Sequence, residues 1–202
     1  SYTDYFVEHS QKAAEQKTML DPTPKIIWVE NIGLIGVGSS KKEATTITDL
    51  GKQNVKVIKD AENAGGFCPV SENDLFDLEY WSLEQSKIDT SPPPPLQGKV
   101  TIITGAAGTI GKAIVTAFSA SGAEVIAIDI NEKAFHEVKF PSNVLTKIVD
   151  LTDANQIKLM IDDIVLQYGG IDILISNAGS APQVALLELD EDTLRQSFEI
   201  NF

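Results

Sequence analysis

The chain has 202 residues, of which 43% are hydrophobic, and its formal net charge is −13. This size suits one or two globular domains, and the acidic balance argues against nucleic acid and anionic membranes, which attract basic patches. The single cysteine, Cys68, excludes an intrachain disulfide and a cysteine-based zinc cluster.

The beginning of the chain carries no recognisable targeting signal. Residues 1–5 lack the basic-then-apolar pattern of a signal peptide, and no apolar run approaches the ~18 residues of a membrane span. We therefore expect a cytoplasmic protein. Because the first residue is not methionine, we also expect the sequence to be a piece of a longer protein.

Residues 1–88 are predicted to form a small α/β segment. A helix-compatible stretch over residues 2–17 ends at two prolines, and strands are expected over 25–30 and 34–38. A long helix should follow, because Ser40-Lys-Lys-Glu43 matches a capping box that satisfies free N–H groups at a helix start. The positions expected to face inward on that helix are Ala44, Ile47, Val55 and Ile58.

The glycines before this helix leave two alternatives open. The spacing Gly33-x-x-Gly36-x-Gly38 could cradle a phosphate, with Lys41 and Lys42 nearby. The other interpretation is that these glycines serve a hairpin and a tight strand-to-helix turn. We favour the second, because no acidic ribose-binding residue follows at a strand end about 20 residues later. After a Gly-Gly pair, a further helix is predicted from Ser71 to about Lys87.

Two stretches of this segment resemble a known family. Residues 26–44 and 74–85 are similar to the end of the class II, metal-dependent aldolase domain in bifunctional rhamnulose-1-phosphate aldolase/short-chain dehydrogenase proteins. The aldolase pattern has a histidine where this chain has Ile32, and the two histidines present, His9 and His136, lie far apart. A zinc site needs three or four ligands. We therefore predict no metal site and interpret the segment as a structural part of an aldolase domain.

Residues 89–98 are predicted to be a proline-rich linker between two domains. Four consecutive prolines remove four N–H donors and favour an extended polyproline II spacer. A recognition site for another protein is the alternative.

Residues 99–202 alternate short apolar runs with helical patterns, which predicts a Rossmann-type, doubly wound parallel sheet that is truncated. The expected strands are 100–103, 124–128, 144–149 and 171–175. The first helix is predicted to bury Ile110, Ala113, Ile114, Ala117 and Phe118. The third is predicted to bury Ile157, Met160, Ile161, Ile164 and Tyr168.

A dinucleotide site is predicted where the first of these strands ends. Gly105 allows a sharp turn, and Gly108 and Gly111 allow the backbone and helix to approach a pyrophosphate, which the helix N-terminus attracts. Asp129 ends the next strand, where its carboxylate can accept both hydroxyls of the adenosine ribose and would repel a 2′-phosphate. Position 130 is isoleucine, and no arginine lies nearby. The predicted cofactor is therefore NAD rather than NADP.

The motifs of this half resemble those of the short-chain dehydrogenase/reductase family. They are Thr104-Gly-Ala-Ala-Gly-Thr-Ile-Gly111, Asp129, Val149-Asp-Leu-Thr152, Ser176-Asn-Ala-Gly179 and Ile200-Asn201. Classical members have glycine where this chain has Thr109. The Thr109 hydroxyl could bind a phosphate or cap the helix.

The resemblance implies a role for each matching residue. Asp150 would bind the adenine amino group, and Asn177 with its two successors would line the cofactor. The predicted cofactor-binding residues are Gly105, Gly108, Thr109, Ile110, Gly111, Asp129, Asp150, Leu151, Asn177, Ala178 and Gly179. Asn201 would be the catalytic asparagine, and it shares a helix face with Leu194 and Phe198, which predicts that it points inward.

In that family a catalytic serine and a Tyr-x-x-x-Lys pair follow the region of Asn201, and residues 1–202 contain no such pair. Without the tyrosine, no general acid–base can serve the carbinol oxygen. We therefore expect this fragment to bind NAD weakly and not to turn over substrate by itself.

The parent protein is expected to be an NAD-dependent oxidoreductase that acts on a small alcohol, an aldehyde or a sugar-derived compound. The fusion resemblance implies a product of deoxy-sugar breakdown such as lactaldehyde. The alternatives are an aldolase (lyase) parent and a non-catalytic nucleotide-binding or assembly fragment. The expected partner is a small-molecule substrate, and we expect binding to neither nucleic acid nor membranes. A homo-oligomer is an open alternative to a monomer.

Overall fold

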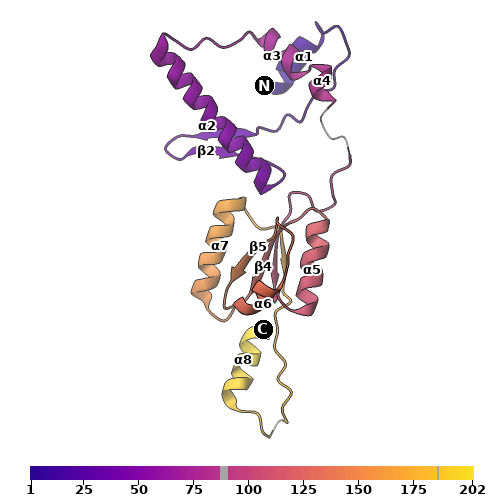
Figure 1. Cartoon of the computed structure of the whole chain (residues 1–202), viewed down its shortest axis with the longest axis vertical. Helices are drawn as coiled ribbons and strands as arrows, with labels where there is room; N and C mark the ends of the chain where they lie inside the picture. Colours follow the sequence, from indigo (N-terminus) through magenta and orange to yellow (C-terminus); the bar gives the residue numbers. More distant parts are fainter. Residues whose placement is uncertain (87–90, 186) are drawn as a thin grey trace. The chain divides into compact units, whose positions relative to one another are not determined.

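The computed structural model describes residues 1–86, 91–185 and 187–202. The chain divides into two compact units, residues 1–38 with 42–92 and residues 39–41 with 93–202. Figure 1 shows both units, with labels on their helices and on β2, β4 and β5. The predicted helix end near Lys87 and the first two linker residues lie outside the described residues. Among the helices that are described, none is long and apolar enough to cross a membrane.

The first unit contains four helices and a hairpin in its described part. Its elements are α1 (Tyr2–Ser10), β1 (Ile26–Val29), β2 (Gly33–Gly36), α2 (Lys41–Ala64), α3 (Glu72–Glu79) and α4 (Ser82–Gln85). β1 and β2 pair antiparallel, with Ile26 opposite Gly36. A Cβ on Gly36 would overlap the Thr48 side chain and the Ala44 carbonyl of α2. This close approach supports the hairpin and strand-to-helix interpretation of the first glycine cluster.

An aromatic cluster joins α1 to α3. The rings of Phe76 and Tyr80 stack at 4.6 Å, and both residues are buried. The hydroxyl groups of Tyr2 and Tyr80 lie 2.6 Å apart, and the Leu20 N–H donates to the Tyr80 hydroxyl at 3.2 Å. These contacts fix Tyr80 at the point where the backbone leaves helical geometry, with φ −101° and ψ 19°.

Three predictions for this unit were wrong in detail. α1 ends at Ser10, seven residues before the predicted Lys17. The helix that begins after Ser71 is interrupted at Tyr80 and resumes as the short α4. On α2, Val55 is 41% exposed, and the buried position is Gly51, which packs against Leu34 of β2.

The second unit is built on a parallel sheet of four strands in the order β5-β4-β3-β6. The strands are β3 (Val100–Thr104), β4 (Glu124–Asp129), β5 (Leu145–Ile148) and β6 (Ile173–Ile175). The helices are α5 (Thr109–Ala120), α6 (Glu132–Glu137), α7 (Ala154–Tyr168) and α8 (Glu191–Asn201). Strands alternate with helices along the chain, and the predicted α/β class with a parallel, doubly wound sheet is confirmed.

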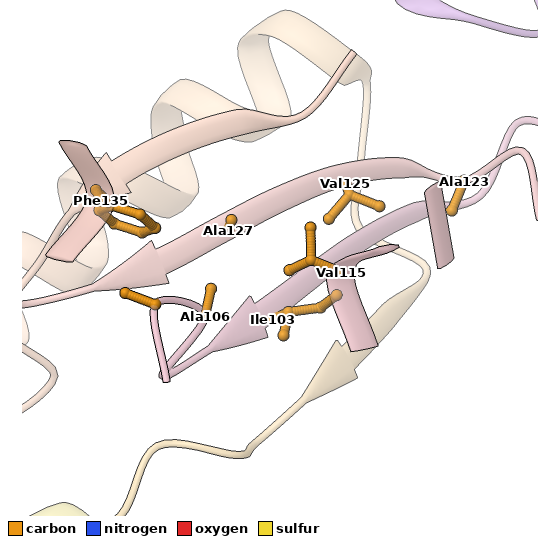
Figure 2. Packing of buried hydrophobic residues seen from close by; sticks show 8 residues of the cluster. Ile103, Ala106, Val115, Ala123, Val125, Ala127 and Phe135 are labelled. Atoms are coloured by element: carbon orange, nitrogen blue, oxygen red, sulfur yellow. The ribbon is translucent and has the colours of Figure 1, made fainter. Parts of the chain in front are cut away.

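Both faces of the central strands are covered. On one face, Val115 of α5 and Phe135 of α6 pack against Ile103, Val125 and Ala127, as Figure 2 shows. On the other face, Met160 and Ile164 of α7 pack against Ile102, Ile126 and Ile128. Burial on both faces explains why β3 and β4 are continuous apolar runs rather than alternating ones.

Local signals set the ends of the helices. The Asn131 and Asp153 side chains accept N–H groups at the starts of α6 and α7, and Gly169 ends α7 with φ 83°. Backbone N–H donation, first from Gln156, holds the pKa of Asp153 below its ordinary value. The predicted inward face of α7 is confirmed.

The predicted inward face of α5 was partly right, because Ile114 and Phe118 pack against the core, whereas Ala113 and Ala117 are exposed. Val115 is fully buried, whereas Ile110 is 68% exposed. The buried positions of the helix are Gly111, where a Cβ would overlap the preceding turn, and Val115.

Candidate functional site

A pocket of about 530 Å³ lies where the parallel strands of the second unit end. Every residue predicted to bind the cofactor lines it. The remaining lining residues are Ile130, Val149, Thr152, Ser180, Gln196 and Ile200. The carboxyl ends of strands in an open α/β sheet are where such folds bind ligands, and the volume lies within the usual range for small-molecule sites.

The turn after β3 is compact because two of its glycines permit close approach. Gly105 has φ 62°, and a Cβ there would lie 2.9 Å from the Ala178 Cα. A Cβ on Gly111 would overlap the Gly105 carbonyl oxygen and lie 2.7 Å from the Ala106 Cα. By contrast, a Cβ on Gly108 would come no closer than 3.3 Å to the Gly105 oxygen. The turn therefore needs glycine at 105 and 111 more than at 108.

The N-terminus of α5 points unpaired donors at the pocket. Its first helical N–H to find a backbone acceptor is that of Lys112, which donates to the Gly108 oxygen at 2.9 Å, and no side chain caps the helix. Within the described chain, the N–H groups of Thr109, Ile110 and Gly111 have no acceptor. Such donors, together with the helix dipole, attract anions. The Thr109 hydroxyl does not cap the helix. Of its two suggested roles, the phosphate contact therefore stays a prediction.

Asp129 stands at the end of β4, on the pocket wall. Its Oδ2 accepts the Ala107 N–H and its Oδ1 accepts the Asn131 N–H, both at 3.0 Å. The carboxylate is half-buried. Each carboxylate oxygen has a second lone pair, so ribose hydroxyls can still donate to it.

Asp150 follows β5 on the same wall. Its Oδ1 accepts the Thr152 N–H at 2.9 Å and the Thr152 hydroxyl at 2.7 Å. Its own N–H donates to the Gln156 side-chain oxygen at 3.1 Å. These bonds hold the Asp150–Leu151 backbone at the mouth of the pocket.

A reciprocal set of hydrogen bonds joins the end of β3 to the end of β6. The Thr104 hydroxyl accepts the N–H groups of Asn177 and Ala178, each at 2.9 Å, and donates to the Ile175 oxygen at 3.4 Å. In return, Asn177 Nδ2 donates to the Thr104 oxygen at 2.9 Å and to the Gly105 oxygen at 3.3 Å. The Asn-Ala-Gly segment and the glycine turn are thereby fixed side by side.

Asn201, the predicted catalytic residue, does not line the pocket, and the prediction that it points inward was wrong. It is exposed, and Phe198 on the same helix face is 59% exposed. Its Nδ2 donates to the Ser180 oxygen at 2.7 Å, and its Oδ1 accepts the Ser180 N–H at 3.3 Å. Ser180 does line the pocket, so Asn201 contacts the pocket wall through the Ser180 backbone.

The charged side chains of the lining are two carboxylates, those of Asp129 and Asp150. No lysine or arginine belongs to the lining in the part of the chain that the structure describes. Anion binding here therefore relies on backbone N–H groups. Of the lining residues missed from sequence, Ile130, Val149 and Thr152 directly adjoin predicted ones, whereas Gln196 of α8 gave no signal.

The first unit shows no comparable group. Among the described residues, no cluster of three histidine, cysteine, aspartate or glutamate side chains could hold a metal ion. Its one buried histidine, His9, has a Nε2 atom 3.7 Å from an oxygen of Glu72.

Comparison with known proteins gives a match for each half. Residues 99–202 match the family model for short chain dehydrogenases, and residues 1–88 match the model for the second domain of class II aldolases. Both resemblances read from the sequence are confirmed.

Among similar proteins, an uncharacterized oxidoreductase of Bacillus subtilis, YuxG, is 30% identical over 203 residues, which is 96% of this chain and 29% of that protein. The 3-oxoacyl-(acyl-carrier-protein) reductase FabG of Thermotoga maritima is 36% identical over 111 residues, 52% of this chain and 45% of that protein. A crystal structure of a short chain dehydrogenase from Bacillus anthracis is 30% identical, with a TM-score of 0.48 over 51% of this chain and 45% of that one. The chain thus spans less than half the length of these relatives.

Proposed function

The chain belongs to the short-chain dehydrogenase family, and we propose that it supplies the NAD-binding part of an oxidoreductase. The reaction would move a hydride between the nicotinamide and the carbinol or carbonyl carbon of a small alcohol, aldehyde or sugar-derived substrate. The observation that carries the proposal is one pocket that combines the unpaired N–H groups at the start of α5 with the Asp129 carboxylate. The first suits a diphosphate, and the second suits a ribose.

The choice of NAD over NADP rests on the charges of the lining. A 2′-phosphate would stand beside the Asp129 carboxylate, with the apolar Ile130 next to it and no lysine or arginine in the described lining. Repulsion between two anions without a cation nearby disfavours NADP. The unmodified ribose of NAD can instead donate its hydroxyls to the carboxylate.

The cofactor would supply the hydride chemistry, and the residues of this chain would bind and orient it. The N–H groups of Thr109, Ile110 and Gly111 would hold the diphosphate, and Asp150 with Leu151 would hold the adenine end. Asn177 fixes the wall on the nicotinamide side through its bonds to Thr104 and Gly105. Asn201 would act by holding the Ser180 backbone in place.

The chemical step needs a group that moves a proton at the carbinol oxygen. The 202 residues contain no Tyr-x-x-x-Lys sequence, which is the family's acid–base pair. We therefore propose that the 202-residue chain binds the cofactor without turning over substrate. A longer protein that contains this chain would carry the activity.

Calorimetric titration of the chain with NAD and NADP at up to millimolar concentration tests the cofactor assignment. We expect NAD to bind at least about fivefold more tightly, since one uncompensated contact between like charges is worth about 1 kcal/mol or more. Equal or tighter binding of NADP would contradict the proposal. Asp129→Ala should reduce the difference in affinity between NAD and NADP.

Activity separates the proposal from its alternatives. A longer protein that contains this chain should reduce NAD in the presence of a small alcohol or hydroxyaldehyde, whereas the 202-residue chain should not. Robust turnover by the 202-residue chain would refute the proposal that this chain binds the cofactor without catalysing the reaction. NAD binding without dehydrogenase activity in the longer protein would favour a non-catalytic nucleotide-binding module, and metal-dependent aldol cleavage would favour the lyase alternative.

A further inference from the structure

Asp129 holds the glycine-rich turn as well as facing the pocket. We propose that it is a positioning residue, whose carboxylate fixes the Ala107 N–H and so aims the N-terminus of α5 at the diphosphate. This inference rests on the proposed function, because it concerns how the same pocket receives its dinucleotide.

The N–H groups on either side of Ala107 have backbone acceptors. The Ala106 N–H donates to the Ile128 oxygen at 3.0 Å, and the Gly108 N–H donates to the Gly105 oxygen at 3.1 Å. The Ala107 N–H alone among these three has a side-chain acceptor, Oδ2 of Asp129. Ala107 is 6% exposed. A buried N–H without an acceptor is costly, so the turn depends on this carboxylate for its shape.

The carboxylate is itself held in place. Its Oδ1 accepts the Asn131 N–H at 3.0 Å, and the Asn131 side chain accepts the Ala134 N–H at the start of α6, also at 3.0 Å. A hydrogen bond to a charged acceptor is about twice as strong as a neutral one. Asp129 therefore ties the end of β4 and the start of α6 to the glycine turn.

The glycine turn sets the direction of the free N–H groups at the start of α5. Thr109 directly follows Gly108, and the Lys112 N–H already donates to the Gly108 oxygen. If Ala107 moves, Gly108 and the first turn of α5 move with it. The N–H groups of Thr109, Ile110 and Gly111 then change direction relative to the pocket.

The two roles of Asp129 make opposite predictions for a ligand that lacks ribose hydroxyls. If Asp129 only recognised hydroxyls, removing its negative charge would leave binding of such an anion unchanged or strengthen it. If Asp129 positions the turn, removing it should weaken binding. The probe is 2′,3′-dideoxyadenosine 5′-diphosphate, compared with ADP.

The experiment combines ligand titration with amide hydrogen exchange of the full 202-residue chain. In Asp129→Ala we expect the Ala107 amide to exchange about tenfold faster or more. We also expect the dideoxy diphosphate to bind at least about threefold more weakly. Unchanged exchange of the Ile102 amide in β3 shows that the variant is folded.

Asp150→Ala is the matched control, because Asp150 lines the same pocket but accepts hydrogen bonds from Thr152 and not from the turn. It should leave Ala107 exchange within twofold of the unsubstituted chain. Asp129→Asn has one acceptor oxygen for two N–H groups, so only one of Ala107 and Asn131 should keep full protection.

Ala107 exchange within twofold of the unsubstituted chain in Asp129→Ala would overturn the inference. Dideoxy diphosphate affinity that is unchanged or stronger would overturn it as well. If the unsubstituted chain binds neither probe nor NAD, the proposed function fails, and Ala107 exchange alone decides whether Asp129 holds the turn.

Discussion

Two threonines in β3 differ in what their hydroxyls contact. Thr101 is fully buried, and its Oγ1 has no hydrogen-bond partner among the residues that the structure describes. Thr104 is also buried, but its hydroxyl takes part in three hydrogen bonds that join β3 to the Asn177–Ala178 segment. The buried threonine hydroxyl therefore destabilises the fold at position 101, whereas at position 104 it joins two segments by hydrogen bonds.

Replacing each threonine by valine should have opposite effects on the free energy of unfolding. Thr101→Val removes an unsatisfied buried hydroxyl and should stabilise the second unit by about 1 kcal/mol. Thr104→Val leaves two N–H groups without an acceptor and should destabilise it by about 2–4 kcal/mol. Denaturant unfolding followed through β3 amide resonances measures both, and a stabilising Thr104→Val would contradict the account.

The glycines of the turn allow a second comparison. Gly111→Ala puts a Cβ onto the Gly105 carbonyl oxygen, so it should destabilise the unit by about 2 kcal/mol or more and abolish NAD binding. Gly108→Ala places a Cβ 3.3 Å from the same oxygen, a tight contact that needs only a small shift, and should cost under about 1 kcal/mol. Calorimetric titration with NAD separates the two variants. Equal losses would show that the turn tolerates no side chain at either position.

At the scale of elements, the sequence predicted the strands of the second unit, and the signals that begin and end its helices are local. Caps such as Asp153 and the left-handed Gly169 act within a few residues. The faces of α5 and α8 were less predictable. Periodicity identifies which residues share a face, but Gly111 and Val115 are the buried positions of α5, and Leu194 and Phe198 of α8 stay exposed.

The Asp153 carboxylate stabilises the N-terminus of α7 in a pH-dependent way. Since N–H donation lowers the pKa of Asp153 below 3.8, its stabilisation is present above that value and is lost as the pH falls through the lowered pKa. Asp153→Ala should lower the melting temperature of α7 at pH 7 and have a smaller effect below pH 3.8. Thermal unfolding followed through α7 amide resonances checks this. Asp153→Asn, an uncharged cap, should show little of this pH dependence, and a constant penalty for Asp153→Ala at every pH would exclude the ionic contribution.

At the scale of the whole molecule, the sequence predicted that residues after the strands of the second unit would lie close together, and they line one pocket. The site was predictable because parallel strands bring their carboxyl ends to one edge, so the residues after β3, β4, β5 and β6 must meet. Two details of the site were not predictable from the sequence. The Asp129–Ala107 bond depends on the exact approach of the turn, and the entry of Gln196 into the lining depends on where α8 lies.

The two units carry different spectroscopic probes. Both tryptophans, Trp28 and Trp81, belong to the first unit, whereas every lining residue of the pocket belongs to the second. At ten times its Kd, NAD should stabilise the second unit by about 1.4 kcal/mol and raise the unfolding midpoint of its amide signals. The midpoint of tryptophan fluorescence should not change. A parallel shift of both midpoints would mean that the units unfold together.

The hydrogen bonds between Thr104 and Asn177 span 73 residues of chain. Closing so long a loop is entropically expensive, so β6 should join the sheet after the local β3–α5–β4 contacts have formed. During refolding, an intermediate with β5, β4 and β3 in place would hold the glycine turn without the wall that completes the pocket. The ability to bind a nucleotide should therefore appear only in the last kinetic phase of folding, which makes ligand binding a reporter of that phase.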